Sequence, residues 1–133
     1  MEQLKARTIS KGTATGKVLV SLDAISFYGG VDPDTGTIVE KGHALEGKTV
    51  AGKILVFPRG KGSTVGSYTI YRLKKNKVAP LAIINKETEA IVAVGVIISD
   101  IPAIDKLEKD AYKNLKTGQI ATVDGNKGVL ILK

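Results

Sequence analysis

The amino-acid sequence predicts a single α/β domain. Its length is 133 residues, and domains most often run to roughly 100–150 residues. Hydrophobic residues make up 43% of the chain, so a buried core is expected and disorder is not. Strand-like and helix-like segments alternate through the middle of the chain, between two ends that are rich in β-forming residues, which is typical of an α/β fold. No internal repeat or linker interrupts the sequence, and we assign residues 1–133 to one domain.

The first third of the chain predicts two strands and a long loop. Residues 4–10 and residues 17–22 (KVLVSL) have the composition of strands. Between them, residues 12–16 (GTATG) are expected to form a turn. Residues 26–41 follow no regular pattern and concentrate glycine, aspartate and proline. A loop of this length in so small a domain tends to be functional.

The middle of the chain predicts a strand–loop–helix–strand unit. Residues 51–57 (AGKILVF) read as a buried strand that ends before Pro58. A short glycine-rich loop, residues 59–63, comes next. Apolar residues near helical spacing predict a helix from about residue 64 to residue 76, and residues 78–84 predict a second buried strand.

The last third predicts two helices, a short strand and a hairpin. Residues 87–94 are expected to form a short apolar helix, and residues 96–98 a short strand. Residues 106–115 repeat an apolar side chain every fourth position, which indicates an amphipathic helix. Residues 119–123 and 128–132 are two strands around an Asp-Gly-Asn turn, a strong hairpin signal.

Composition excludes several classes of function. The chain has no cysteine, so it cannot form a disulfide, a thiolate metal site or an iron–sulfur cluster on its own. The N-terminal segment lacks a secretory signal and no apolar stretch is long enough for a membrane span, so we expect a cytoplasmic protein with no membrane contact.

The net charge of +7 does not by itself indicate nucleic-acid binding. Basic residues are spread along the chain, and the one dense run, residues 72–77, falls where a helix should end and where cations complement the helix dipole. Six aromatic residues form no repeated stacking platform. We therefore expect no nucleic-acid partner, and a positive surface suits an acidic protein partner or an anionic metabolite.

The glycine-rich loop is the strongest candidate site. A strand ends, Gly60 and Gly62 free the backbone, and a helix is expected to begin with Ser63 near its N-cap. Such a turn aims unpaired N–H groups and the positive end of a helix at an anion, and Arg59 and Lys61 add positive charge. The spacing matches neither a Walker A loop nor G-x-G-x-x-G. From the residues alone, the alternative is that Ser63 only caps the helix.

His43 is the only histidine of the chain. It lies in a turn-like segment, which favours a structural role, while an acid, base or carrier function remains the alternative. The sequence offers neither a Cys–His pair nor a G-x-S-x-G nucleophile elbow.

Four segments match the pattern of one known family in order. They are residues 26–33 (SFYGGVDP, followed by Gly36), 43–47 (HALEG), 50–56 (VAGKILV) and 60–63 (GKGS). The chain resembles the small subunit, or swivel domain, of the aconitase X family. Tyr28 stands where many relatives have tryptophan, and Lys61 where arginine is common.

The resemblance implies a β/β/α swivelling domain like the mobile domain of aconitase, with a mixed, barrel-like sheet and two to three helices. It also implies a heteromer. This chain would bind no cofactor, and a large catalytic subunit would carry a 4Fe–4S cluster and most of the substrate pocket. The serine at position 63 is implied as the proton acceptor. Seven neighbours are expected to contact the substrate: Arg59, Gly60, Lys61, Gly62, Thr64, Gly29 and Gly30.

The implied reaction is the dehydration of (R)-5-phosphomevalonate to trans-anhydromevalonate 5-phosphate in the archaeal mevalonate route to isoprenoids. A sister branch of the family dehydrates cis-3-hydroxy-L-proline, which is one alternative. Two alternatives from other classes are a phosphoryl-carrier domain that uses His43 and a stand-alone anion-binding module. The residues agree with the dehydratase on two points: a cysteine-free chain needs a partner to hold a cluster, and Arg59 and Lys61 can stabilise developing negative charge.

Overall fold

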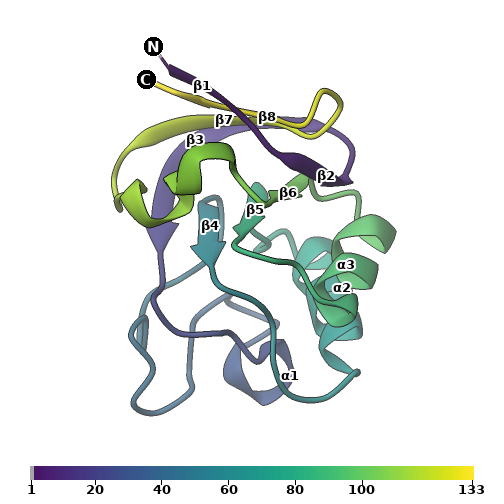
Figure 1. The fold of residues 1–133 in the computed structure, drawn as a ribbon. Helices are drawn as coiled ribbons and strands as arrows, with labels where there is room; N and C mark the ends of the chain where they lie inside the picture. The colour runs from purple at the N-terminus through teal and green to yellow at the C-terminus, as the bar shows by residue number, and fades with distance from the viewer. Residues whose placement is uncertain (1) are drawn as a thin grey trace.

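Eight strands form one mixed sheet in the computed structural model, which describes residues 2–133 (Figure 1). The strands are β1 (Glu2–Lys5), β2 (Arg7–Ser10), β3 (Thr13–Val20), β4 (Ile54–Phe57), β5 (Ala82–Asn85), β6 (Ala103–Asp105), β7 (Ile120–Asp124) and β8 (Val129–Leu132). The helices are α1 (Phe27–Gly30), α2 (Gly66–Lys75), α3 (Ala90–Ile98) and the 3₁₀ segment η1 (Glu108–Asn114). This confirms the predicted α/β class and the swivel-type mixed sheet.

The N-terminal segment closes the sheet into a barrel. The strand order is β1-β8-β7-β3-β4-β5-β6-β2, and only Ala6 separates β1 from β2. β1 pairs antiparallel with β8 at one edge, and β2 pairs antiparallel with β6 at the other. The Ala6 N–H donates to the Gly128 carbonyl at 2.8 Å between the two pairings. One continuous piece of chain thus covers both edges of the sheet, which leaves neither open for pairing with another chain.

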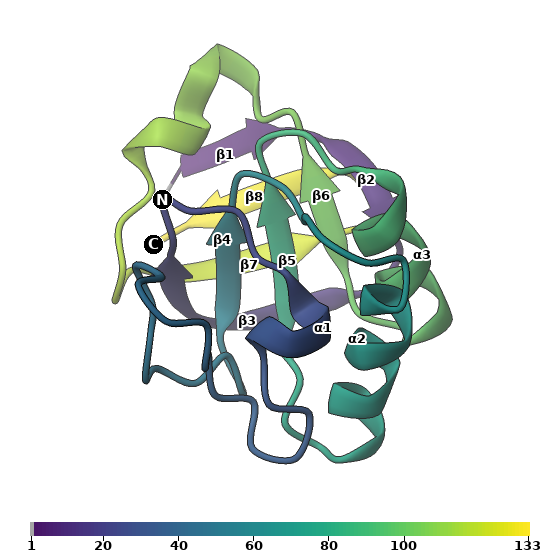
Figure 2. The ribbon, with the colours of Figure 1, turned by 90° about the horizontal axis from the view of Figure 1, so that it is seen from below.

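The barrel has a parallel half and an antiparallel half. β3, β4, β5 and β6 run parallel to one another, while β7, β8 and β1 continue from β3 in antiparallel fashion. β3 serves both halves, because its first five residues pair with β7 and its last three with β4. The β4 arrow points down in Figure 1, toward the end of the molecule where α1 and the loops around it lie; these loops are nearest the viewer in Figure 2.

Two apolar cores lie on opposite sides of the parallel strands. Along β4, Ile54 and Val56 point into the barrel, and Leu55 and Phe57 point outward to a second core beneath the helices. This alternation explains why the whole strand is apolar, since a strand that is covered on both faces buries every side chain. The Phe27 ring of α1 meets the Phe57 ring edge-on at 5.8 Å in the outer core.

α2 and α3 lie side by side over the outer core (Figures 1 and 2). Each helix connects two neighbouring parallel strands, which places both on the same face of the sheet. Gly95 of α3 faces Ile70 of α2, and a Cβ at Gly95 would come within 2.6 Å of the Ile70 Cδ1 atom. The glycine therefore sets how closely the two helices approach.

Three predictions for individual elements are wrong. Residues 12–16 were expected to turn, but Thr13 to Gly16 belong to β3, because pairing with β7 outweighs the local turn composition. Residues 96–98 form the last turn of α3 rather than a strand, and the strand comes later as β6. Residues 106–115 form only an irregular 3₁₀ segment with Lys109 and Asp110 at positive φ, although Leu107, Ala111 and Leu115 are buried as their spacing predicts.

One other prediction for an element is correct. The C-terminal hairpin is confirmed, with Asp124 opposite Val129 at its closed end. Within residues 2–133, no helix has the length and apolar character that crossing a membrane requires.

Candidate functional site

The loop between β4 and α2 lies at the carboxyl end of the parallel strands, where open α/β sheets commonly bind ligands. Arg59, Lys61, Ser63 and Thr64 are exposed, whereas Gly60 is buried. The N–H groups of residues 62, 63 and 64 donate to no acceptor within the described part of the chain. Three neighbouring amide donors are thus without an acceptor in an exposed loop that also carries Arg59 and Lys61.

Glu89 holds the start of this loop. Its Oε1 atom accepts the Gly60 N–H at 3.2 Å and the Val92 N–H at 3.1 Å, and its Oε2 atom accepts the Ile91 N–H at 2.7 Å. One carboxylate therefore caps α3 and ties the loop to it. A Cβ at Gly60 would lie 2.5 Å from the Glu89 Oε1 atom, so this approach requires glycine. The role of Glu89 was not predicted from the sequence. The local pattern that could have indicated it is an acidic residue directly before an apolar run, where a helix N-cap is expected.

A second loop, residues 25–30, lies against the first. The Ile25 N–H donates to the Arg59 carbonyl at 3.2 Å, and the Lys61 N–H donates to the Ile25 carbonyl at 3.0 Å. Gly62 adopts a φ of +87°, and a Cβ there would overlap the Ser26 hydroxyl. The two loops border a hollow of about 380 Å³ whose lining includes Gly29, Gly30, Lys61 and Gly62. The structure thus brings together four of the predicted site residues.

Ser63 is exposed and does not occupy the N-cap position. α2 begins at Gly66 with Val65 as its N-cap residue, whose side chain provides no cap. The Ser63 Oγ atom accepts the Val65 N–H at 3.1 Å, and the Ser63 carbonyl accepts the Gly66 N–H at 2.9 Å. Ser63 stabilises the turn that leads into the helix. Within residues 2–133 its hydroxyl donates to no acceptor.

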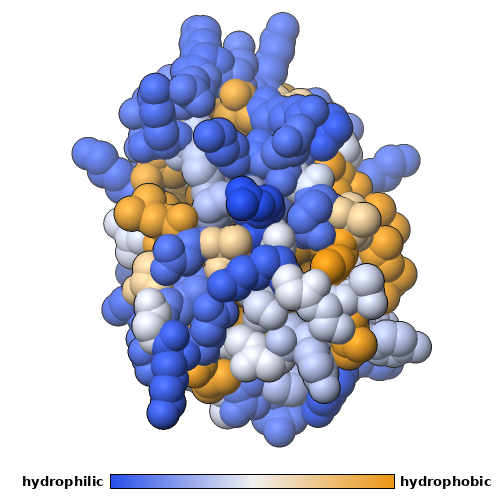
Figure 3. Space-filling model, turned by 60° about the horizontal axis from the view of Figure 1, so that its bottom comes forward, coloured by the Kyte–Doolittle hydropathy of each residue, from blue (hydrophilic) through white to orange (hydrophobic). Residues whose placement is uncertain are grey.

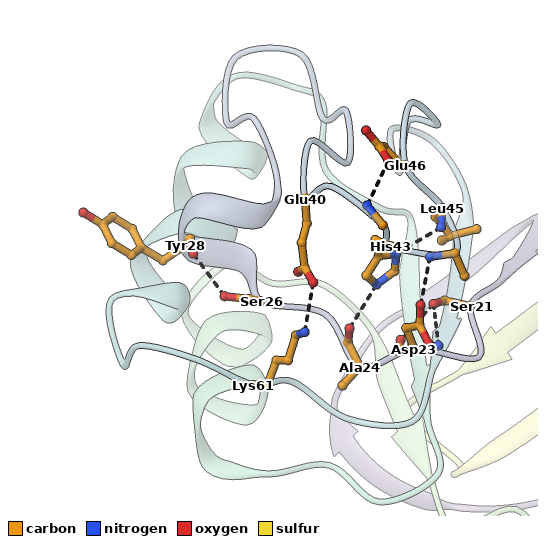
Figure 4. Close-up of polar contacts among 12 residues, drawn as sticks. Ser21, Asp23, Ala24, Ser26, Tyr28, Glu40, His43, Leu45, Glu46 and Lys61 are labelled. Carbon is orange, nitrogen blue, oxygen red and sulfur yellow. Dashed lines mark hydrogen bonds and ion pairs between the residues drawn. The ribbon is translucent and has the colours of Figure 1, made fainter.

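The two cations of the loop line different hollows. The Lys61 Nζ atom forms an ion pair with Glu40 Oε2 at 3.0 Å, beside the glycines of the second loop (Figure 4). Arg59 instead lines a hollow of about 540 Å³ that it shares with Arg7 and Lys86. Arg59 and Lys61 were expected to flank one anion site, but the structure places them at different hollows.

His43 has a structural role. It is only 6% exposed, its Nδ1 atom accepts the Leu45 N–H at 3.0 Å, and its Nε2 atom lies 3.0 Å from the Ala24 carbonyl (Figure 4). Because Nδ1 is the acceptor, Nε2 carries the proton and donates it to Ala24. Both ring nitrogens are committed to backbone groups, so the imidazole is not presented to a phosphoryl donor.

The described residues do not fit a 4Fe–4S cluster. Thiolates are the usual ligands of such clusters, and the chain has none. Between residues 2 and 133, no three His, Asp or Glu side chains converge where they could hold a metal ion.

Comparison with known proteins places this geometry in a family. The family model "Aconitase X swivel domain" matches residues 3–132. The phosphomevalonate dehydratase small subunit of Methanosarcina acetivorans is 60% identical over 130 residues, which are 98% of this chain and 90% of that protein. The protein of the same name from Thermococcus kodakarensis is 55% identical over 126 residues, which are 95% of this chain and 92% of that protein.

Solved structures agree. A chain in the crystal structure of Thermococcus kodakaraensis aconitase X (holo-form) superposes with a TM-score of 0.95 at 53% identity, covering 100% of this chain and 99% of that one. A structural-genomics target solved by solution NMR gives a TM-score of 0.90 at 45% identity, with 99% of each chain covered. The chain belongs to the aconitase X swivel-domain family.

Proposed function

We propose that this chain is the small subunit of a heteromeric hydro-lyase that dehydrates (R)-5-phosphomevalonate to trans-anhydromevalonate 5-phosphate. The observation that carries the proposal is the 60% identity, over 98% of the chain, to a protein named phosphomevalonate dehydratase small subunit. The archaeal mevalonate route in the cytoplasm is the setting that this reaction implies.

The exposure of the loop supports a site completed by a second subunit. Ser63 and Thr64 are exposed, and the two hollows lined by the preceding residues Arg59, Lys61 and Gly62 are open to solvent. A dehydratase site usually excludes water, since a low dielectric strengthens its electrostatic interactions. The name "small subunit" of the relatives implies a larger partner. In this proposal the large subunit covers the loop and shields it from water. It also carries the 4Fe–4S cluster and the thiolates that bind it.

In this proposal Ser63 accepts the proton that the substrate loses beside its carboxylate. Proton removal builds negative charge, and the outward N–H groups of residues 62–64, together with Lys61, can stabilise it. A serine hydroxyl is a weak base, and no described residue accepts its proton. The positive charge around the loop, increased by the partner, must therefore favour the alkoxide. Gly62 and Gly60 let the loop lie against Ser26 and Glu89, which holds the backbone that leads to Ser63.

Reconstitution tests the proposal. The chain and the large subunit encoded in the same genome are purified together without oxygen, and the complex is given phosphomevalonate or cis-3-hydroxy-L-proline. We expect water loss from phosphomevalonate only. If only cis-3-hydroxy-L-proline reacts, the chain is instead the small subunit of a hydroxyproline dehydratase. If no cysteine-rich partner co-purifies and neither compound reacts, the dehydratase assignment is wrong.

A further inference from the structure

One hollow beside the loop is lined by basic side chains to which the proposed dehydratase mechanism gives no role. It lies where β4 and β5 end, has a volume of about 540 Å³, and borders the N-terminal end of α3. Its charged lining consists of Arg7, Arg59, Lys86, Glu87 and Glu89. Figure 3 shows the loop-bearing face of the molecule, with strongly hydrophilic groups near its centre and an apolar band at the right edge, on the side of α3.

The two glutamates of this hollow are already engaged. Both Glu89 oxygens accept backbone N–H groups, from Gly60 and from the first turn of α3. Glu87 forms an ion pair with Lys106, with 3.3 Å between Oε1 and Nζ. Glu87 also contributes to the raised pKa of Arg7, but neither carboxylate lies within ion-pair distance of Arg59 or Lys86.

Arg7 is held rigidly at the edge of the hollow. Its Nε and Nη2 atoms donate to Asp105 at 2.9 and 2.7 Å, and Asp105 is fully buried and also accepts the Thr88 N–H at 2.7 Å. The hydrogen bond and the charge of Asp105 raise the pKa of Arg7. The charge of Arg7 is thus compensated, but its Nη1 donors have no acceptor among residues 2–133.

Arg59 and Lys86 are the cations without compensation. Neither side chain lies within ion-pair distance of a carboxylate in the described part of the chain. Lys86 contributes to the lowered pKa of Asp110, but the larger cause is the direct partner of Asp110, Lys113, at 2.9 Å. In the other hollow, by contrast, Lys61 is paired with Glu40. Of the two hollows beside the loop, only this one carries two unpaired positive charges.

We propose that the hollow of Arg7, Arg59 and Lys86 binds the phosphate group of the substrate. A phosphate monoester carries close to two negative charges at neutral pH and has three acceptor oxygens, which match two free cations and the remaining Arg7 donors. Ser63 lies four residues beyond Arg59, a separation that extended chain spans in at most about 14 Å. One end of the substrate then rests in the hollow while the reacting carbon meets Ser63. This inference rests on the proposed function.

The competing occupant is an acidic side chain of the large subunit. A single carboxylate brings one negative charge and would leave one of the two free cations uncompensated where the partner covers the hollow, which is unfavourable. A phosphate dianion satisfies both, and this charge balance favours the substrate.

The test uses the reconstituted heteromer, with inorganic phosphate as the probe. Arg59→Gln and Lys86→Gln each remove one free charge, and Lys127→Gln, in the exposed β7–β8 turn, is the matched control. We expect each site variant to raise the KM for phosphomevalonate and the inhibition constant of inorganic phosphate about 10-fold, since a charge-assisted contact contributes ~1.4 kcal/mol or more. The value of kcat should change less than KM. Lys127→Gln should change neither constant, and Arg59→Lys should recover most of the loss.

Size-exclusion chromatography of each variant checks assembly. An unchanged KM and inhibition constant in both site variants would overturn the phosphate site. Weaker assembly with an unchanged inhibition constant would assign the hollow to an acidic segment of the partner instead. If the wild-type complex does not dehydrate phosphomevalonate, the proposed function fails, and calorimetric binding of inorganic phosphate to the same complexes still decides whether the hollow binds phosphate.

Discussion

The Ser63 hydroxyl makes one structural hydrogen bond and is the proposed proton acceptor. Two substitutions distinguish the contribution of each role. Its Oγ atom accepts the Val65 N–H at an exposed position. Loss of that bond should lower the free energy of unfolding by only ~0.5–1 kcal/mol, since water can replace the hydroxyl. Loss of a proton acceptor should lower kcat by roughly 10²–10⁴. We expect both effects in Ser63→Ala and in Ser63→Gly, measured by urea unfolding and by turnover of the reconstituted complex.

Thr35→Ala is the control for Ser63. The Thr35 Oγ1 atom accepts the Thr37 N–H at 3.2 Å, also two residues on and also exposed, and it further donates to the Thr37 Oγ1 atom at 3.0 Å, so its loss sets an upper limit for the structural effect. It should show a similar loss of stability with unchanged turnover. A Ser63→Gly complex that assembles and turns over within a few-fold of wild type would exclude Ser63 as the base.

The burial of Tyr112 leads us to expect that the free energy of unfolding falls at alkaline pH. Its hydroxyl is buried without a hydrogen-bond partner in residues 2–133, and burial raises its pKa to about 12. Unfolded tyrosine titrates near pH 10, so between these values the native state holds a proton that the unfolded state has lost. This contribution to stability is therefore complete below about pH 10 and is lost as the pH rises toward 12.

Tyr112→Phe tests this assignment. It removes the unsatisfied hydroxyl, so we expect the free energy of unfolding at pH 7 to stay the same or rise by up to ~1 kcal/mol. The difference between wild type and variant should then change in favour of the variant above pH 10, in urea unfolding at a series of pH values. A variant that is less stable at pH 7 would show that the hydroxyl has a favourable contact after all.

At the scale of elements, the contact between the two loops depends on Gly62. Gly62 and Gly47 have nearly the same φ, +87° and +84°, and both are exposed. Alanine at either position should cost ~1 kcal/mol in backbone strain. Only at Gly62 does the added Cβ meet an atom, the Ser26 hydroxyl. We expect Gly62→Ala to lose more stability than Gly47→Ala and to be the only one of the two that lowers kcat, by more than tenfold. Equal turnover in the two variants would show that loop contact does not matter for activity.

The elements that the sequence predicted correctly are those with a clear period or a strong turn. β4 is apolar throughout and β5 is apolar up to its last residue, Asn85, and the Asp-Gly-Asn turn marks the β7–β8 hairpin. α3 was predicted only in part, as a helix over residues 87–94 followed by a strand at 96–98, because its sequence AIVAVGVII is apolar on every face and rich in β-branched residues. What makes it a helix is the Glu89 cap and its packing on α2, and neither is visible locally.

The candidate site also contains residues that the sequence predicted and residues that it did not. The glycine, serine and basic residues of the loop were predicted from composition and from the family pattern, and the structure places Gly29 and Gly30 beside Lys61 and Gly62. The contributions of Glu89, Arg7 and Lys86 were not predicted. They lie 29, 52 and 27 residues from Gly60 or Arg59 in the sequence, and only barrel closure and the parallel strand order bring them to the loop.

At the scale of the whole molecule, the two cores and the closed barrel predict that the chain folds without its partner. The barrel core and the outer core are each made of buried apolar side chains, and in residues 2–133 no sheet edge is left open because β1 and β2 cover both. The isolated chain is not expected to be active, since it lacks the thiolates that hold a cluster. We therefore expect the isolated chain, expressed alone and purified without oxygen, to unfold cooperatively in urea, to contain no stoichiometric iron by colorimetric analysis, and to leave phosphomevalonate unchanged. Addition of the large subunit should restore turnover, and Ser63→Ala added in the same way should assemble without restoring it. Stoichiometric iron in the isolated chain, or turnover by it alone, would contradict its assignment as a subunit that depends on a cluster-bearing partner.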